Sequence, residues 1–214
     1  MDKKKLAGII IVVIILAFSF FNLFKNKTQD IEDFEINPNE IVNRLRGEIV
    51  YVKRDGNFFN VYTISANGNN EKFLYHNVDA INSNCLCPEW SENGSRIYFT
   101  AMRGGRWKAF SMNIDGGDVI LEQKEPCLGD VGPKDKDILW ERGSLFRVDD
   151  KGERTIIYYH KNFNSNFNVG ANSAAWSPDK NFIIFELNGF IFIADKDGRS
   201  MKEIIMGSYP NWKY

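Results

Sequence analysis

Four copies of an eight-residue pattern constrain the fold of this chain more than any other feature of its sequence. The second position is aromatic in every copy, the fourth is apolar, and the last two positions form a turn dipeptide ending in glycine. Aromatic and apolar residues at a period of two, followed by such a dipeptide, predict a strand that leads into a tight turn. The copies align without a gap and read VYTISANG to Gly68, AFSMNIDG to Gly116, LFRVDDKG to Gly152 and IFIADKDG to Gly198.

Two further short strands are expected around each copy. Upstream lie IVYV, IYFT, ILWE and IIFE, and downstream lie EKFLYH, DVILEQ, RTIIYY and KEIIM. A fourth strand, which carries Trp90 or Trp176, precedes the second and the fourth copy. Four antiparallel strands in about 40 to 45 residues are typical of a β-propeller blade, which needs neighbours to cover its faces. The chain is therefore predicted to be all-β, with a small β-propeller over residues 45–214.

Two segments carry a resemblance to a known family. PEWSENG, at Pro88–Gly94, and AWSPD, at Ala175–Asp179, resemble the Pro-x-Trp-Ser-Pro-Asp-Gly motif of TolB-type, WD-like propeller repeats. The resemblance covers about residues 45–214, but the first and third copies lack this turn, which leaves their inner strands open. It implies that the turn caps the inner strand of a blade and that the tryptophan packs between blades, and it implies no activity. The residues given this structural role are Trp90, Ser91, Trp176, Ser177, Pro178 and Asp179.

The two ends of the repeat region complement each other. Pro210-Asn211-Trp212 repeats the Pro-Glu-Trp of the second copy, but no second strand follows it, and the first copy opens at GEIVYV without an inner strand. We therefore expect the strand with Trp212 to supply the inner strand of the first blade, which would give four blades closed by the C-terminal strand. An open part of a six- or seven-bladed ring, or a half that dimerises, is the alternative.

The N-terminal residues predict a membrane anchor. An uncharged stretch runs from Leu6 to Phe24 between lysine-rich flanks, close to the roughly 20 residues that a membrane-spanning helix needs. A cleaved secretory signal and a buried helix are the alternatives, although the stretch has no clear cleavage site and no polar face. Residues 1–5 would form a cytoplasmic basic tail, 6–24 a single transmembrane helix and 25–44 a polar stalk. The positive-inside bias then places the propeller outside the cytoplasmic membrane, in the periplasm or at the cell surface.

Charge bears on the partners of this chain. The five N-terminal lysines and Asp2 aside, acidic residues outnumber basic ones, which argues against binding a phosphate backbone, so no nucleic-acid partner is expected. The most basic exposed loop of the body is expected to be RGGRW, where Arg103, Arg106 and Trp107 are candidate contacts for an anionic or carbohydrate partner. A plain surface hairpin is the alternative reading of this loop.

Three cysteines and two histidines are the remaining candidates for chemistry. Both cysteine segments are expected just before an inner strand, so that Cys127 could form a disulfide with Cys87, or with Cys85, on a neighbouring blade. Free buried thiols and a metal site are the alternatives, but no fourth metal ligand lies near in sequence. His76 and His160 occupy matching places on alternate blades, so they should lie far apart. No metal or cofactor is expected, because the acidic turns also lack the spacing of calcium loops.

The sequence contains no nucleophile elbow, phosphate-binding loop, dinucleotide fingerprint or zinc-protease motif. The favoured reading is a non-enzymatic, membrane-anchored propeller that binds a protein or envelope partner, an expectation that rests on analogy of fold. An enzyme of unrecognised type, such as a propeller associated with a hydrolase, and a structural subunit of a membrane complex are the alternatives.

Overall fold

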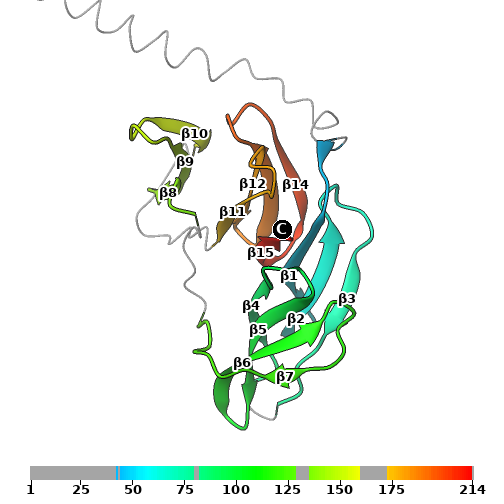
Figure 1. Cartoon of the computed structure of the whole chain (residues 1–214). Helices are drawn as coiled ribbons and strands as arrows, with labels where there is room; N and C mark the ends of the chain where they lie inside the picture. The colour runs from blue at the N-terminus through cyan, green and yellow to red at the C-terminus, as the bar shows by residue number, and fades with distance from the viewer. Residues whose placement is uncertain (1–41, 43, 80–81, 129–134, 160–172, 214) are drawn as a thin grey trace, which may run out of the picture. The chain divides into compact units, whose positions relative to one another are not determined.

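The computed structural model describes residues 42, 44–79, 82–128, 135–159 and 173–213 (Figure 1). These residues belong to one compact unit, Asn37–Tyr214. The expected tail at 1–5, the expected anchor at 6–24 and nearly all of the expected stalk lie outside the described residues. Within the described ranges, no helix is long and apolar enough to cross a membrane.

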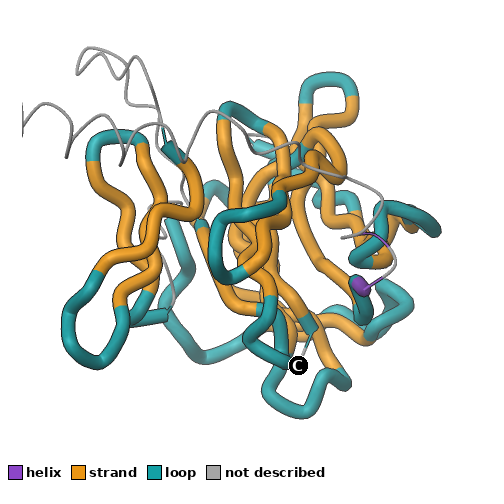
Figure 2. The backbone as a smooth tube through the Cα atoms, turned by 90° about the horizontal axis from the view of Figure 1, so that it is seen from above, coloured by secondary structure: helices purple, strands orange, loops and turns teal. Residues whose placement is uncertain are grey.

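Strands joined by short turns make up most of the described backbone, as Figure 2 shows, and the chain is all-β in this part. Four antiparallel sheets follow one another along the sequence. The second sheet has the order β4 (Cys85–Trp90), β5 (Arg96–Arg103), β6 (Arg106–Asn113), β7 (Ile120–Leu121). The fourth sheet has the order β11 (Ala174–Trp176), β12 (Phe182–Leu187), β13 (Phe190–Asp195), β14 (Met201–Met206).

The first and third sheets depart from this simple meander. The first sheet consists of β1 (Glu48–Asp55), β2 (Phe58–Ser65) and β3 (Lys72–Tyr75), with β15 (Ser208–Trp212) added beside β1. The third sheet has three strands among the described residues, in the order β10 (Arg154–Tyr158), β9 (Ser144–Val148), β8 (Ile138–Glu141). Its inner strand, which the sequence left open, therefore has no counterpart in the described part.

The C-terminal strand joins the first sheet, and this expectation is confirmed. β15 runs antiparallel to β1, with Ile49 opposite Trp212 and Val50 opposite Asn211. The Trp212 side chain is buried, and its indole N–H donates to the Arg46 carbonyl at 3.0 Å. Because β15 occupies the inner edge of β1, that edge is not left open for pairing with other chains.

Apolar side chains link the sheets in the order second, first, fourth, third. Clusters of buried residues lie between the first and fourth sheets, between the first and second, and between the third and fourth. The first and fourth sheets are apolar on both faces, and all six residues of β12 are buried. The second sheet differs, because Ile97, Phe99 and Met112 line one face whereas Thr100 and Ser111 lie buried on the other.

Contacts of the turn glycines at the ends of the four repeat copies agree with this order of sheets. All four have a positive φ, between 69° and 91°, which a residue with a side chain rarely adopts. A Cβ atom at Gly116 or Gly198 would come within 3.0 Å of the backbone of Leu74 or Ile156, in the outer strand of the preceding sheet. Gly68 approaches Ile204 of the fourth sheet, whereas Gly152 has no atom within 4 Å. Closure between the second and third sheets therefore stays a prediction.

Candidate functional site

The hairpin between β5 and β6 presents the basic loop that the sequence singled out. Gly104 and Gly105 form its turn with positive φ angles of 63° and 72°, and Arg103 faces Arg106 across it. The Gly104 N–H donates to the Asp79 carboxylate at 2.8 Å. Since Asp79 belongs to the segment that follows β3, this bond ties the hairpin of the second sheet to the first.

The three predicted contact residues have different environments. Arg103 donates to the Tyr75 hydroxyl at 3.2 Å and lies 5.1 Å from the ring centroid of Phe110, within cation–π range. The Arg106 side chain is exposed, without a hydrogen bond or ion pair to any described residue, and Trp107 is half-buried. The structure therefore assigns Arg103 to holding the loop in place, and it leaves Arg106 and part of Trp107 available to a partner.

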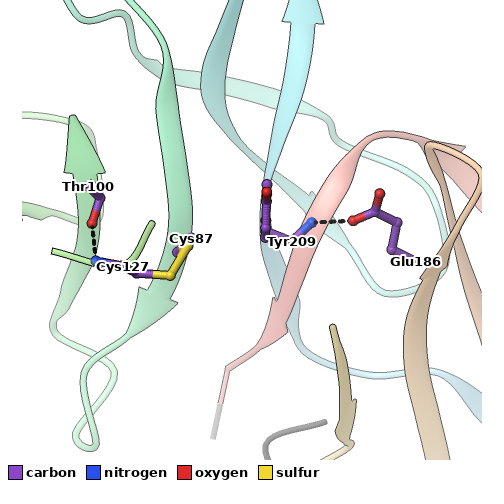
Figure 3. The surroundings of a disulfide bond; sticks show 5 residues. All are labelled: Cys87, Thr100, Cys127, Glu186 and Tyr209. Carbon is purple, nitrogen blue, oxygen red and sulfur yellow. Dashed lines mark hydrogen bonds between the residues drawn. A yellow bond between two sulfur atoms is a disulfide. The ribbon is translucent and has the colours of Figure 1, made fainter. Parts of the chain in front are cut away.

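The disulfide joins Cys87 to Cys127 (Figure 3). Cys87 lies within the inner strand β4, and Cys127 lies on the segment that returns from β7 across the same sheet, where its N–H donates to Thr100 Oγ1 at 2.9 Å. The expectation that Cys87 precedes its inner strand and meets Cys127 on a neighbouring blade is therefore wrong, whereas residues 129–134, which follow the Cys127 segment, lie outside the described residues. After β7 the chain does not enter the next sheet directly, because residues 122–127, here called the strap, first cover the polar face of the second sheet.

Cys85 is a free, buried cysteine. Burial raises the pKa of its thiol to about 12, so that the reactive thiolate is almost absent near neutral pH. Among the described residues, no group of three histidine, cysteine or acidic side chains could hold a metal ion. His76 lies 2.7 Å from the Asn60 side-chain oxygen, and His160 lies outside the described residues.

A buried carboxylate lies at the junction of the first and fourth sheets. Glu186 of β12 accepts hydrogen bonds from the Ser208 hydroxyl at 3.0 Å and from the Tyr209 N–H at 3.1 Å (Figure 3). Burial raises the pKa of Glu186, and the two hydrogen bonds oppose this rise. The cavity between Tyr209 and the disulfide measures about 80 Å³, well below the roughly 300 Å³ at which small-molecule sites begin. It is a packing gap.

The motif residues make the contacts of a capped turn. The Ser91 and Ser177 hydroxyls accept hydrogen bonds at 3.0 Å from the N–H groups of Arg96 and Phe182 respectively. Ser177 also donates to Asp179 at 2.6 Å. Trp90 and Trp176 are buried within the apolar clusters of their sheets, whereas Pro178 is exposed. These residues build the turn after the inner strand of the second and fourth sheets, and none of them points to chemistry.

Sequence reasoning missed the polar side chains that connect the sheets. Glu186 and Asn211 were not singled out, although each bonds a backbone group of a neighbouring sheet. Asp79, which bonds the turn between β5 and β6 from the segment that joins the first two sheets, was also missed. Asn211 alone had a usable signal, because it stands at the place in Pro-Asn-Trp that Glu89 holds in Pro-Glu-Trp. Asp79 and Glu186 lie in no motif or repeat position, and packing between distant segments decides their partners, so the sequence contains no signal for them.

Comparisons with known proteins find matches among solved structures. No family model matches the chain, and no curated protein matches it. The chain is similar to TolB from Acinetobacter baumannii, with 13% identity and a TM-score of 0.32 over 78% of this chain and 43% of that one. It is also similar to a putative TolB from Agrobacterium tumefaciens, with 13% identity and a TM-score of 0.32 over 76% and 63%, and to a chain of a nidogen/laminin complex, with 11% identity and a TM-score of 0.30 over 76% and 64%. This chain spans less than two thirds of each of these neighbours.

Proposed function

We propose that this chain is a membrane-anchored interaction module, built from the blades of a small β-propeller, which binds a protein or other envelope partner and carries out no catalysis. The four repeat-based sheets and the pairing of β15 with β1 support the propeller part of this proposal. The apolar stretch 6–24 and its flanking lysines support an anchor with the blades outside the cytoplasmic membrane.

The main support for a binding role is the hairpin between β5 and β6, whose conformation is fixed by contacts with other segments. Asp79 fixes its turn and Tyr75 fixes Arg103, so that Arg106 and Trp107 are presented on a pre-organised loop. Arginine and tryptophan are enriched among the residues that dominate binding energy at interfaces, and a loop held in place loses little conformational entropy on binding. A partner with an acidic patch fits the guanidinium of Arg106, which has no ion-pair partner among the described residues.

Site-specific crosslinking tests this role in native membranes. A photoreactive residue at position 106 should capture a defined partner, whereas the same residue at the exposed Lys151, in a turn of the third sheet, should not. Arg106→Glu should weaken the capture by about tenfold or more, because a favourable charge contact becomes a repulsive one. Equal capture at both positions would overturn the assignment of the hairpin.

Two further measurements separate this proposal from its alternatives. Replacing residues 6–24 by an unrelated membrane helix should preserve capture at position 106. If the chain were instead a structural subunit that contacts its complex through this helix, the same replacement would prevent assembly of the complex. Turnover in a panel of peptidase, esterase and glycosidase substrates would contradict the non-catalytic role. Protease accessibility of the body in sealed vesicles of known orientation tests its side of the membrane.

Closure of the four blades belongs to the same proposal and has its own test. Spin labels at Leu121 of β7 and Lys151, beside Gly152, lie on the two sheets whose contact closes the ring. A single narrow distance distribution would support a closed four-bladed ring. A broad distribution, or one that narrows only on dimerisation, would favour the open alternatives.

A further inference from the structure

A groove of about 560 Å³ opens on the polar face of the second sheet. Its lining comes from the turn that joins β4 to β5, from Arg96 and Tyr98 of β5, and from Glu122 and Lys124 of the strap. This volume lies within the range of about 300 to 1,000 Å³ that is typical of ligand sites. The groove is a different place from the hairpin at Arg106, which belongs to the turn at the other end of β5.

The strap wall of the groove is fixed at both ends. The Glu122 N–H donates to the Ala109 carbonyl at 2.9 Å, and the Ser111 hydroxyl donates to the Glu122 carboxylate at 2.6 Å. At the far end, the disulfide holds Cys127. Between these points the Lys124 ammonium lies 3.9 Å from the ring centroid of Tyr98. The strap is not a β-strand, and these contacts at its two ends hold it in place instead.

The opposite wall is held by Asn93. Its side-chain oxygen accepts hydrogen bonds from the hydroxyls of Ser91 and Ser95, at 2.9 and 2.7 Å, and from the Ser95 N–H at 3.1 Å. Because the oxygen is committed to the turn, the amide nitrogen of Asn93 has two N–H groups to offer. Neither of them has a partner within the part of the chain that the structure describes.

Several other polar groups of the groove also have unused hydrogen-bonding capacity. Among the described residues, the Tyr98 hydroxyl and the Glu92 carboxylate have no hydrogen-bond partner, and Lys124 has only its ring contact. The set thus offers donors on Asn93 and Lys124, acceptors on Glu92, and a hydroxyl on Tyr98 that can serve in either role. The half-buried ring of Tyr98 lies between them, with the Lys124 ammonium over it.

The charges of the lining rule out a strongly charged ligand. Arg96 is paired with Asp118 at 2.9 Å and also donates to Ser111 and Asn113. Counted with Arg96, the lining carries two basic side chains, Arg96 and Lys124, and two acidic ones, Glu92 and Glu122, so neither sign is in excess for an anion or a metal ion. Electrostatic complementarity therefore favours a neutral ligand.

We propose that this groove binds a neutral polyhydroxylated ligand, namely a short oligosaccharide, which packs a ring face on Tyr98 in place of Lys124. Sugar hydroxyls donate and accept hydrogen bonds, so they match the mixture of donors and acceptors on the two walls. The apolar ring face of a sugar suits the Tyr98 ring, which combines an apolar surface with a polar end. Glu122 and Lys124 of the strap form one wall of the groove, so binding depends on the Cys87–Cys127 disulfide that holds the strap.

Binding of defined glycans to the full chain tests the proposal. The chain is placed in lipid nanodiscs, because maltoside detergents carry competing sugars, and is probed with neutral and with sulfated or sialylated oligosaccharides. We expect measurable affinity for at least one neutral oligosaccharide and none for its sulfated form. No neutral binding, or a preference for the anionic probes, would overturn the proposal.

Variants then locate the binding site. Tyr98→Ala should weaken binding by about tenfold or more, through loss of the stacking surface, and Tyr98→Phe by about three- to tenfold, through loss of one hydrogen bond. Glu92→Ala, at an exposed position that does not endanger folding, should weaken binding by about threefold or more. Tyr159→Ala removes an exposed tyrosine that directly follows β10 of the third sheet, and it is the matched control. Equal affinities for the Tyr98 and Tyr159 variants would contradict the site.

Variants in the strap and in the β5–β6 hairpin distinguish glycan binding from the partner binding of the proposed function. Cys127→Ser, or reduction of the wild-type chain by a dithiol, should weaken glycan binding, and unchanged affinity would overturn the role of the strap. Arg106→Glu should leave glycan binding unchanged while it weakens partner capture. Loss of glycan binding in that variant would place the glycan at the hairpin instead.

Discussion

The side-chain oxygen of Asn211 accepts a hydrogen bond of 2.9 Å from the backbone N–H of Trp90, a residue 121 positions earlier in the chain. An Asp135 oxygen accepts from the Trp176 N–H in the same way, at 3.1 Å. In both pairs, a polar side chain bonds the motif tryptophan in the inner strand of another sheet. The first sheet is thereby bound to the second, and the segment before the third sheet is bound to the fourth.

Removal of the Asn211 side chain should destabilise the domain. Asn211→Ala leaves the buried Trp90 N–H without its acceptor, which costs about 1–3 kcal/mol. Urea unfolding of the full chain, followed by tryptophan fluorescence, measures this loss. Asn57→Ala, at an exposed turn residue, is the matched control and should change the free energy of unfolding by less than about 0.5 kcal/mol. Similar losses in the two variants would contradict the role of this bond.

The turn glycines should differ in their tolerance of alanine although their sequence patterns are alike. Gly152→Ala should cost about 1–2 kcal/mol, because only the positive φ opposes a side chain there. Gly116→Ala and Gly198→Ala should each cost about 2–5 kcal/mol, because their Cβ atoms would also collide with the backbone of the preceding sheet. Thermal unfolding of the three variants provides the comparison. Equal destabilisation at Gly152 would mean that it also docks against a neighbouring sheet.

The cysteines should show an ordered pattern of reactivity. In the folded chain no thiol should react with a maleimide near pH 7, because Cys85 is buried and the other two form a disulfide. Unfolding without reductant should expose one thiol, and unfolding with reductant should expose three, as mass spectrometry can count. Reduction should also lower the free energy of unfolding by about 2–4 kcal/mol, since the bond closes a loop between residues 40 positions apart. Labelling of more than one thiol before reduction would contradict the bond.

The buried carboxylate of Glu186 should make stability depend on pH in the acidic range. Burial raises its pKa in the folded state above the ordinary value of 4.5, so the unfolded chain ionises first as the pH rises. The contribution of this group is fully present below about pH 4.5 and is lost as the pH rises through the folded-state pKa. Glu186→Gln cannot ionise, so the stability of the wild type relative to this variant should fall between pH 4 and pH 7.

Chemical denaturation at a series of pH values measures this dependence. Glu203→Gln, at an exposed position of β14, is the control and should track the wild type across the same range. A wild-type stability that rises relative to Glu186→Gln between pH 4 and pH 7 would contradict the direction assigned to the pKa of Glu186.

Local periodicity was sufficient to locate most of the strands. Each eight-residue copy corresponds to the second long strand of a sheet and its turn, and the strand before it pairs with it as expected. The place of Trp212 could also be predicted. The C-terminal segment resembles an inner strand with no second strand after it, and the first copy of the repeat lacks an inner strand, so the two were expected to pair. The strap could not be predicted. Glu122 and Gln123 were expected to continue the outer strand, which ends at Leu121, and the hydrogen bonds of the strap go to side chains and edges of β5 and β6.

The sequence by itself determined which residues form strands and turns, because alternation of side chains and turn dipeptides are local properties of the backbone. Only the tertiary structure decided which turn glycines meet a neighbouring sheet and that Cys127 returns to its own sheet. It also decided that Arg103 bonds Tyr75, whereas the Arg106 side chain has no partner in the part of the chain that the structure describes. Those outcomes depend on distances between segments far apart in the chain, which close packing sets and no local pattern encodes.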